Sequence, residues 1–268
     1  MLNRSELIQA IRQKGSYLCV GLDTDIRKIP SHLLSEPDPV YAFNKRIIDA
    51  TQAFCVSYKI NTAFYESQGI KGWESLQKTV DYLPADVLSI ADAKRGDIGN
   101  TSAQYAKTFF ETYNFDAVTV APYMGADSVQ PFLDYKDKWT ILLALTSNPG
   151  AADFEMQKTG EEYLYEKVLK TAAGWGSSEN LMFVVGATQA AHMASIRALC
   201  PGHFFLVPGV GTQGGSLQEL SHHAINADVG LLVNVSRAII YASAGHDFAE
   251  KAAAVAKGYQ QEMALLLP

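Results

Sequence analysis

The sequence predicts an α/β fold, a (β/α)8 TIM barrel that occupies the whole chain, residues 1–268, as a single domain. Eight apolar runs alternate with segments of helical character, and no Ser-, Gly- or Pro-rich linker divides the chain. Near-continuous apolar runs are typical of parallel strands that are buried on both faces. Eight strand–helix units in about 250 residues match such a barrel. A doubly wound open sheet has the same alternation and is the alternative.

The eight expected strands follow one another along the chain at regular intervals. They lie within residues 17–23, 55–61, 87–94, 117–122, 139–147, 181–188, 203–211 and 229–236. In barrels of this kind the chemistry takes place at the carboxyl ends of the strands and in the loops that follow them. Two of these loops, 24–38 and 148–158, are long enough to cover a ligand.

Helix starts are predicted between the strands. Asp38 before Pro39 predicts a capped helix over 40–54, with Val40, Phe43, Ile47 and Thr51 on its buried face. Three capping boxes predict further starts, at Thr101–Gln104, Thr159–Glu162 and Ser216–Glu219. The first 15 residues read as a short amphipathic helix, because they lack the uninterrupted apolar region of a signal peptide.

Composition excludes several classes of protein. With 48% hydrophobic and 19% charged residues, a disordered chain is not expected. The net charge of −6 argues against a nucleic-acid-binding or anionic-membrane surface, and no apolar stretch approaches the ~18 residues of a membrane span. The three cysteines form no CxxC pair, which predicts free thiols and a cytoplasmic protein. The six histidines show no metal-ligand spacing, so no metal is expected.

The segment IADAKRGDIGNT carries most of the chemistry. Asp92 and Lys94 are two residues apart on an expected strand, so both should point to one face. Asp97 adds a second carboxylate, and Lys59 at the end of the preceding strand adds a second ammonium. Each charge would hold its neighbour ionised. The plain alternative is a salt bridge at a sheet end, with Asp97 or Asn100 capping the next helix. We favour function because buried charge is costly without a purpose.

A second candidate region follows the last two expected strands. Loops 209–215 and 234–238 contain glycines, whose backbone N–H groups can approach an anion, and the guanidinium of Arg237. Gly209, Gly211 and Gly214 spell a literal GxGxxG. A dinucleotide site would need an acidic residue about 20 positions later, at the end of the next strand. Asp228 follows Gly214 by 14 residues and precedes its strand, so we reject that interpretation.

Several motifs together resemble one family. They are DAKRGDI, with its GNT extension, and GLD, YKIN, TSNPG, PGVGTQG and VSR. In this order they resemble the orotidine 5′-phosphate decarboxylases, in the type 2 bacterial subgroup. The resemblance implies that orotidine 5′-phosphate loses CO2 to give UMP, without metal or cofactor, as the last step of de novo pyrimidine nucleotide synthesis.

The resemblance also implies roles for individual residues. Lys94 would donate a proton to C6 of the pyrimidine, and Asp92 would sit near the departing carboxylate. Asp97 would reach the active site of a second subunit, which implies a homodimer with shared active sites. Lys59 and Asp23 would bind ribose hydroxyls. The remaining substrate-binding residues would be Asn61, Thr101 at the partner's ribose, Ser147 at the pyrimidine edge, Gln213 between phosphate and pyrimidine, Gly214, Ser236 and Arg237.

Two other functions remain open. A metal-assisted sugar-phosphate decarboxylase shares the Asp-x-Lys-x-x-Asp motif, but it needs a carboxylate at the end of the second strand, where Lys59 stands here. A non-catalytic barrel that binds a phosphorylated metabolite would have no need of the paired charges.

Overall fold

The computed structural model describes residues 2–187, 190–211 and 215–268. Its main sheet consists of β1 (Leu18–Gly21), β2 (Ser57–Asn61), β3 (Leu88–Arg95), β4 (Ala117–Val120), β5 (Trp139–Leu145), β8 (Leu181–Val185), β9 (Phe205–Pro208) and β10 (Leu231–Val235). These strands form a closed barrel in the order β1-β10-β9-β8-β5-β4-β3-β2. Seven of them lie inside their predicted runs, and β3 extends one residue beyond the predicted 87–94, to Arg95. The predicted barrel is confirmed, and the open sheet is excluded.

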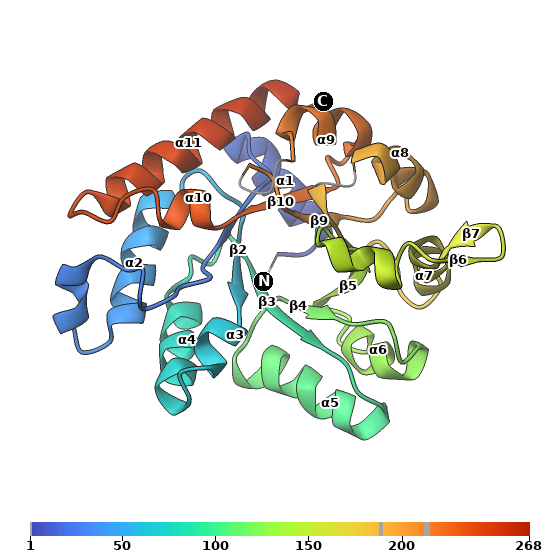
Figure 1. Ribbon diagram of the computed structural model, residues 1–268, viewed down its shortest axis with the longest axis horizontal. Helices are drawn as coiled ribbons and strands as arrows, with labels where there is room; N and C mark the ends of the chain where they lie inside the picture. The colour runs from blue at the N-terminus through green and yellow to red at the C-terminus, as the bar shows by residue number, and fades with distance from the viewer. Residues whose placement is uncertain (1, 188–189, 212–214) are drawn as a thin grey trace. The chain divides into compact units, whose positions relative to one another are not determined.

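The chain divides into two compact units. The first comprises residues 1–93, 113–116 and 234–267, and the second comprises 94–112 and 117–233. In the first, β1, β2 and most of β3 are accompanied by α1 (Arg4–Lys14), α2 (Pro39–Thr51), α3 (Ala63–Glu66), α4 (Ile70–Tyr82), α10 (Arg237–Ile240), α11 (Phe248–Leu266) and the 3-10 turn η1 (Ser31–Ser35). Helix α2 packs against both α4 and α11 (Figure 1).

Helix α2 forms as its sequence predicts. The carboxylate of Asp38 accepts a hydrogen bond from the backbone N–H of Tyr41 at 3.1 Å, and Pro39 occupies the first helical position. The four apolar-face residues from Val40 to Thr51 are all buried. The helix ends at Thr51, three residues before the expected end.

The second unit contains β4, β5, β8, β9, the first part of β10, and several helices. These are α5 (Gly99–Lys107), the π-helical turn η2 (Thr108–Thr112), α6 (Ala126–Leu133), the 3-10 turn η3 (Pro149–Asp153), α7 (Leu164–Ala172), α8 (Ala190–Leu199) and α9 (Leu217–Ala224). Helix α5 packs on α6, and α8 packs on α9. A small antiparallel hairpin, β6 (Lys158–Thr159) and β7 (Glu162–Tyr163), precedes α7.

Two of the three capping boxes are wrong. Helix α5 begins at Gly99, before Thr101, and Ile98 precedes it without a side-chain cap. Thr159 and Glu162 pair with each other in the β6–β7 hairpin, because Gly160 at φ 77° turns the chain there. Only the cap at Ser216 is confirmed, with its hydroxyl accepting from Glu219 N–H at 3.2 Å.

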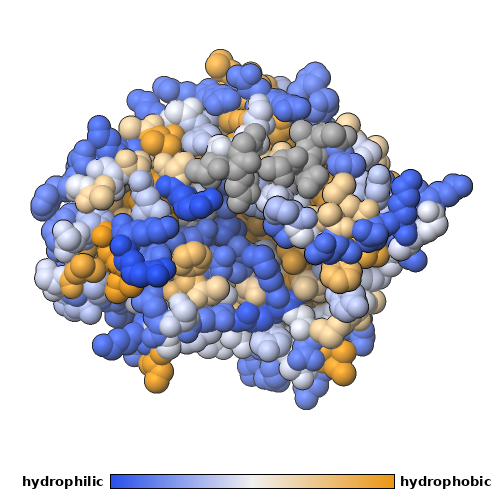
Figure 2. Space-filling model, in the orientation of Figure 1, coloured by the Kyte–Doolittle hydropathy of each residue, from blue (hydrophilic) through white to orange (hydrophobic). Residues whose placement is uncertain are grey.

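Most of the large buried side chains are apolar. Cys19, Cys55 and Cys200 are buried free thiols, as predicted. On the face drawn in Figure 2, hydrophilic residues predominate and hydrophobic residues form small separate patches. Within the described part of the chain, every helix is too short or too polar to cross a lipid bilayer.

Candidate active site

A buried ammonium lies between two carboxylates at the carboxyl ends of β1, β2 and β3. The Nζ atom of Lys59 is 3.1 Å from Oδ1 of Asp23 and 2.9 Å from Oδ2 of Asp92. The register of the parallel strands causes this meeting, because Gly21 pairs with Lys59 and Asn61 pairs with Asp92. The Lys59 side chain is only 5% exposed. Three of the predicted charged residues are therefore brought together.

The two carboxylates keep Lys59 charged. Burial alone lowers the pKa of a lysine, but here the nearby carboxylates of Asp23 and Asp92 outweigh it and raise the pKa of Lys59 above its ordinary value. In turn, the ammonium offsets the repulsion that the two carboxylates would otherwise feel. Such an arrangement presents fixed charge to a ligand without reorganisation, which is what electrostatic catalysis requires.

Lys94 has an unusual backbone. Its φ is 48°, in the left-handed region that a residue with a side chain enters only at a cost. Its N–H donates to Oγ1 of Thr119 on β4 at 2.9 Å, which helps to hold this conformation. The prediction that Asp92 and Lys94 point to the same face requires extended backbone at both residues. It therefore does not hold for Lys94. The expectation of a buried charge is also wrong for Lys94, whose side chain is exposed.

Residues 97–101 lead into α5 and form its first turn, with Asp97 half-buried and the other four exposed. The Oδ1 atom of Asp97 accepts a hydrogen bond from Ile98 N–H at 2.7 Å. Thr101 is exposed in the first turn of the helix and caps nothing. Ile98 in this turn is 60% exposed, and Tyr123, which follows β4, is 91% exposed.

Asn61 is the last residue of β2, and Ser147 lies two residues after the end of β5. The Asn61 Oδ1 atom accepts from the N–H of Ala63 at 3.2 Å and so shapes the entry to α3. Ser147 lies so close to Gly186, after β8, that a Cβ at position 186 would stand 2.7 Å from the Ser147 backbone N. Glycine is therefore required opposite Ser147.

The predicted phosphate region is described in part. Ser236 and Arg237 lie at the junction of β10 and α10, and the Arg237 side chain is exposed. Gly21 on β1 lies directly against Ser236, because a Cβ on Gly21 would overlap the Ser236 hydroxyl. Gln213 and Gly214 lie outside the described residues.

Sequence reasoning missed the residue that holds the loop after β5. Glu155 accepts hydrogen bonds from the backbone N–H of Thr146 at 2.6 Å and from the Thr146 hydroxyl at 2.9 Å. The loop 148–158 is thus attached to the end of its own strand. An acidic residue in a long loop gives no sequence signal for this contact, since its partner is fixed only by the fold.

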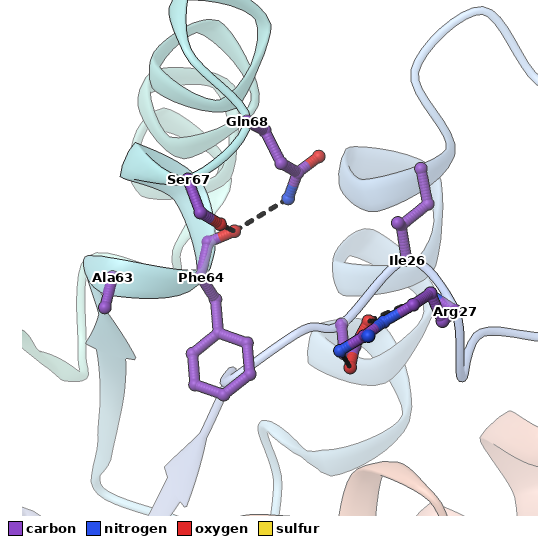
Figure 3. A pocket seen from close by; sticks show the side chains of 7 residues that line it. Ile26, Arg27, Ala63, Phe64, Ser67 and Gln68 are labelled. Carbon is purple, nitrogen blue, oxygen red and sulfur yellow. Dashed lines mark hydrogen bonds and ion pairs between the residues drawn. The ribbon is translucent and has the colours of Figure 1, made fainter.

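A pocket opens beside the end of β1. It has a volume of about 350 Å³ and is lined by Asp25, Ile26, Arg27, Ala63, Phe64, Ser67 and Gln68. Figure 3 shows the loop after β1 on one side and α3 on the other, with the Phe64 ring between them. In this loop Arg27 pairs with Asp25 at 2.8 Å, and the guanidinium lowers the pKa of Asp25 to about 2.

Across residues 2–187, 190–211 and 215–268, no three His, Cys, Asp or Glu side chains gather in a way that could hold a metal ion.

The fold and the charged strand ends define an α/β-barrel enzyme with an ammonium–carboxylate site. The model of the orotidine 5′-phosphate decarboxylase / HUMPS family matches residues 16–254, and the chain belongs to this family. The predicted resemblance is thereby confirmed.

Individual relatives agree with this assignment. The orotidine 5′-phosphate decarboxylase of Christiangramia forsetii is 59% identical over 266 residues, which cover 98% of each chain. That of Bacteroides fragilis is 56% identical over 267 residues, covering 98% of this chain and 97% of its own.

Solved structures show the same fold. The Leishmania donovani OMP decarboxylase has a TM-score of 0.83 and 36% identity, covering 98% of this chain and 99% of its own. The Leishmania donovani UMP synthase has a TM-score of 0.86 and 38% identity over 97% of this chain. The present chain spans 55% of that longer structure.

Proposed function

We propose that this enzyme converts orotidine 5′-phosphate to UMP and CO2, the last step of de novo pyrimidine nucleotide synthesis, without metal or cofactor. The whole chain, 1–268, would act as one catalytic domain. The observation that carries the proposal is Lys59, buried with its ammonium 3.1 and 2.9 Å from the carboxylates of Asp23 and Asp92. Family membership supplies the substrate class.

The reaction requires stabilisation of a carbanion. The bond between C6 and the carboxylate breaks, the electron pair stays on C6, and CO2 leaves. No adjacent carbonyl delocalises this charge, so a fixed ammonium is the stabiliser the residues can offer. Opposite charges about 4 Å apart attract by roughly 4 kcal/mol at an effective dielectric of about 20. We assign this role to Lys94, which then gives its proton to C6 and is reprotonated from water.

Asp92 contributes by repulsion. Its carboxylate would lie beside the carboxylate of the substrate, and this repulsion disappears when CO2 departs. The ammonium of Lys59 donates to Oδ2 of Asp92 at 2.9 Å and so holds this carboxylate in place. Lys59 and Asp23 would in addition bind the ribose hydroxyls, with Asn61 beside them.

We assign the phosphate and the pyrimidine edge of the substrate to residues that follow the later strands. Arg237 would bind the phosphate through its guanidinium, together with Ser236, Gln213 and the backbone of Gly214. Ser147 would contact the pyrimidine edge. The Arg237 side chain is exposed, so its guanidinium is accessible to an anionic ligand.

A homodimer would complete the site. We assign Asp97 and Thr101 to the active site of a second copy of the chain. Asp97 is half-buried, whereas Thr101 and the large side chains of Ile98 and Tyr123 are exposed. Burial of these two side chains against a second subunit would remove their apolar surface from water. A cytoplasmic location fits the three free thiols.

One assay tests the reaction. Purified protein is given orotidine 5′-phosphate in excess chelator, and the loss of orotate absorbance is followed. We expect full turnover, unchanged by the chelator. Loss of turnover on chelation would favour a metal-assisted decarboxylase, and binding of UMP without turnover would favour a non-catalytic barrel. Either result would overturn the proposal.

A further inference from the structure

The backbone around Asp23 is held by side chains from three helices or their ends. Leu22 O accepts from the hydroxyl of Tyr65 on α3 at 3.0 Å. The hydroxyl of Tyr241, the residue that ends α10, donates to Asp23 O at 3.2 Å and accepts from Asp25 N–H at 2.7 Å. The hydroxyl of Thr24 donates to Asn44 on α2 at 2.6 Å. Four successive residues of one loop are thus each fixed from outside it.

The hydroxyl of Tyr241 bridges the loop across Asp23. It contacts the carbonyl of Asp23 and the N–H two residues later, so one group sets the direction of the chain at this carboxylate. Its ring is held in place by stacking on Phe43, with ring centroids 6.0 Å apart. Burial raises the pKa of Tyr241 to about 12, so the hydroxyl keeps its proton and can donate throughout the neutral range.

The opposite side of the loop is equally fixed. Tyr65 is fully buried, and its oxygen accepts from Asn44 Nδ2 at 2.8 Å while its proton goes to Leu22 O. The same Asn44 also donates to Thr79 at 3.0 Å. Every polar atom named in this network has a partner, and a fully satisfied buried network holds a single geometry.

We propose that Tyr241 is a positioning residue that aims the carboxylate of Asp23 at Lys59, with Tyr65 bracing the other side of the loop. The inference rests on the proposed function, since it gives Asp23 a part in substrate binding. If the backbone of this loop moved, the Cα atom of Asp23 would shift with it, and only some backbone positions let Oδ1 reach Lys59. Fixing the backbone on both sides removes that freedom before substrate arrives.

The test is a double-mutant cycle between Tyr241 and Asp23. Tyr241→Phe keeps the ring and removes the hydroxyl, and we expect kcat/KM for orotidine 5′-phosphate to fall about tenfold. In an Asp23→Asn background the same change should alter kcat/KM less than twofold, because the group it positions is already disabled. Tyr82→Phe is the matched control: its hydroxyl donates to Asp49 at 2.7 Å on the surface, and kcat/KM should be unchanged.

The possible outcomes separate the two claims. Equal losses from Tyr241→Phe in both backgrounds would mean a general structural role and would overturn the inference, as would no loss in the wild-type background. If the wild-type enzyme lacks turnover, the proposed function fails by itself. A crystal structure of Tyr241→Phe then decides the inference: a longer Asp23–Lys59 distance than in the wild type supports it, and an unchanged distance overturns it.

Discussion

Asn61 pairs with Asp92 across the β2–β3 ladder, and this register brings the Lys59 ammonium to 2.9 Å from the Asp92 carboxylate. A slip of one residue would move the Lys59 side chain to the other face of the sheet. The geometry of the charged site is therefore a direct consequence of strand pairing. The pairing register is in turn specified by the buried apolar residues of β2 and β3.

Removing Lys59 should harm both stability and activity. In Lys59→Ala the carboxylates of Asp23 and Asp92 lose the cation between them. We expect the free energy of unfolding to fall by on the order of 3 kcal/mol, and kcat/KM for orotidine 5′-phosphate to fall at least a thousandfold. Urea denaturation and steady-state kinetics measure the two effects. Lys78→Ala is the control, since Lys78 is also 2.9 Å from a carboxylate, that of Asp38, but its side chain is 51% exposed. There the loss of stability should stay below about 1 kcal/mol, and equal losses in the two variants would contradict the account.

The stability that Lys59 provides should depend on pH only in the alkaline range. Its pKa is raised in the folded protein, so its contribution is complete below the unfolded value of about 10.4 and is lost as pH rises toward the folded pKa. We therefore expect the stability difference between the wild type and Lys59→Ala to be constant from about pH 7 to 9 and to shrink above about pH 10.4. Urea unfolding at several pH values measures it. A difference that disappears below pH 9 would mean that Lys59 is not held charged.

Lys94 should show a conflict between stability and activity. Its φ of 48° is easy for glycine and strained for other residues. Lys94→Gly should therefore be more stable than Lys94→Ala, by about 1 kcal/mol, while both variants lack turnover because the proton donor is gone. Thermal unfolding and the orotate assay test the pair, and Lys107→Ala on α5 is the control that should keep full activity. Retained turnover in either variant at position 94 would refute its role as proton donor.

Gly21 should tolerate no side chain. A Cβ there would overlap the Ser236 hydroxyl and approach Asn234 Nδ2 to 3.0 Å, so Gly21→Ala should lower stability by about 1–3 kcal/mol. Gly258 lies on α11 with nothing within 4 Å of the same added atom, and Gly258→Ala should stabilise the protein by up to about 1 kcal/mol. Chemical denaturation of both variants provides the comparison. The close contact would be refuted if Gly21→Ala were as stable as the wild type.

The strands could be predicted because their signal is local and strong. Each strand is an apolar run buried on both faces. The position of Lys59 and Asp92 toward the carboxyl ends of β2 and β3 can be predicted from where these runs end. Helix starts could be predicted less accurately, because the capping-box pattern is only four residues long. The cap at Ser216 formed, whereas the pattern at Thr159 gave way to a hairpin turned by Gly160.

The contacts that fix the loops could not be predicted. Glu155 meets Thr146, and Tyr241 meets Asp23 from a position 218 residues away in the chain. Such partners are chosen by the closed barrel and not by neighbours in the sequence. The left-handed conformation of Lys94 could not be predicted either, because the residue is neither a glycine nor an asparagine, the types that usually adopt it.

The central claim is that this site stabilises negative charge on C6 and supplies a proton to it. Exchange of the C6 hydrogen of UMP in D2O measures this directly, because it forms the same carbanion without CO2. By proton NMR, the account predicts that the wild-type enzyme replaces this hydrogen with deuterium and that Lys94→Ala does not. No exchange by the wild type, or equal exchange by Lys94→Ala, would contradict it.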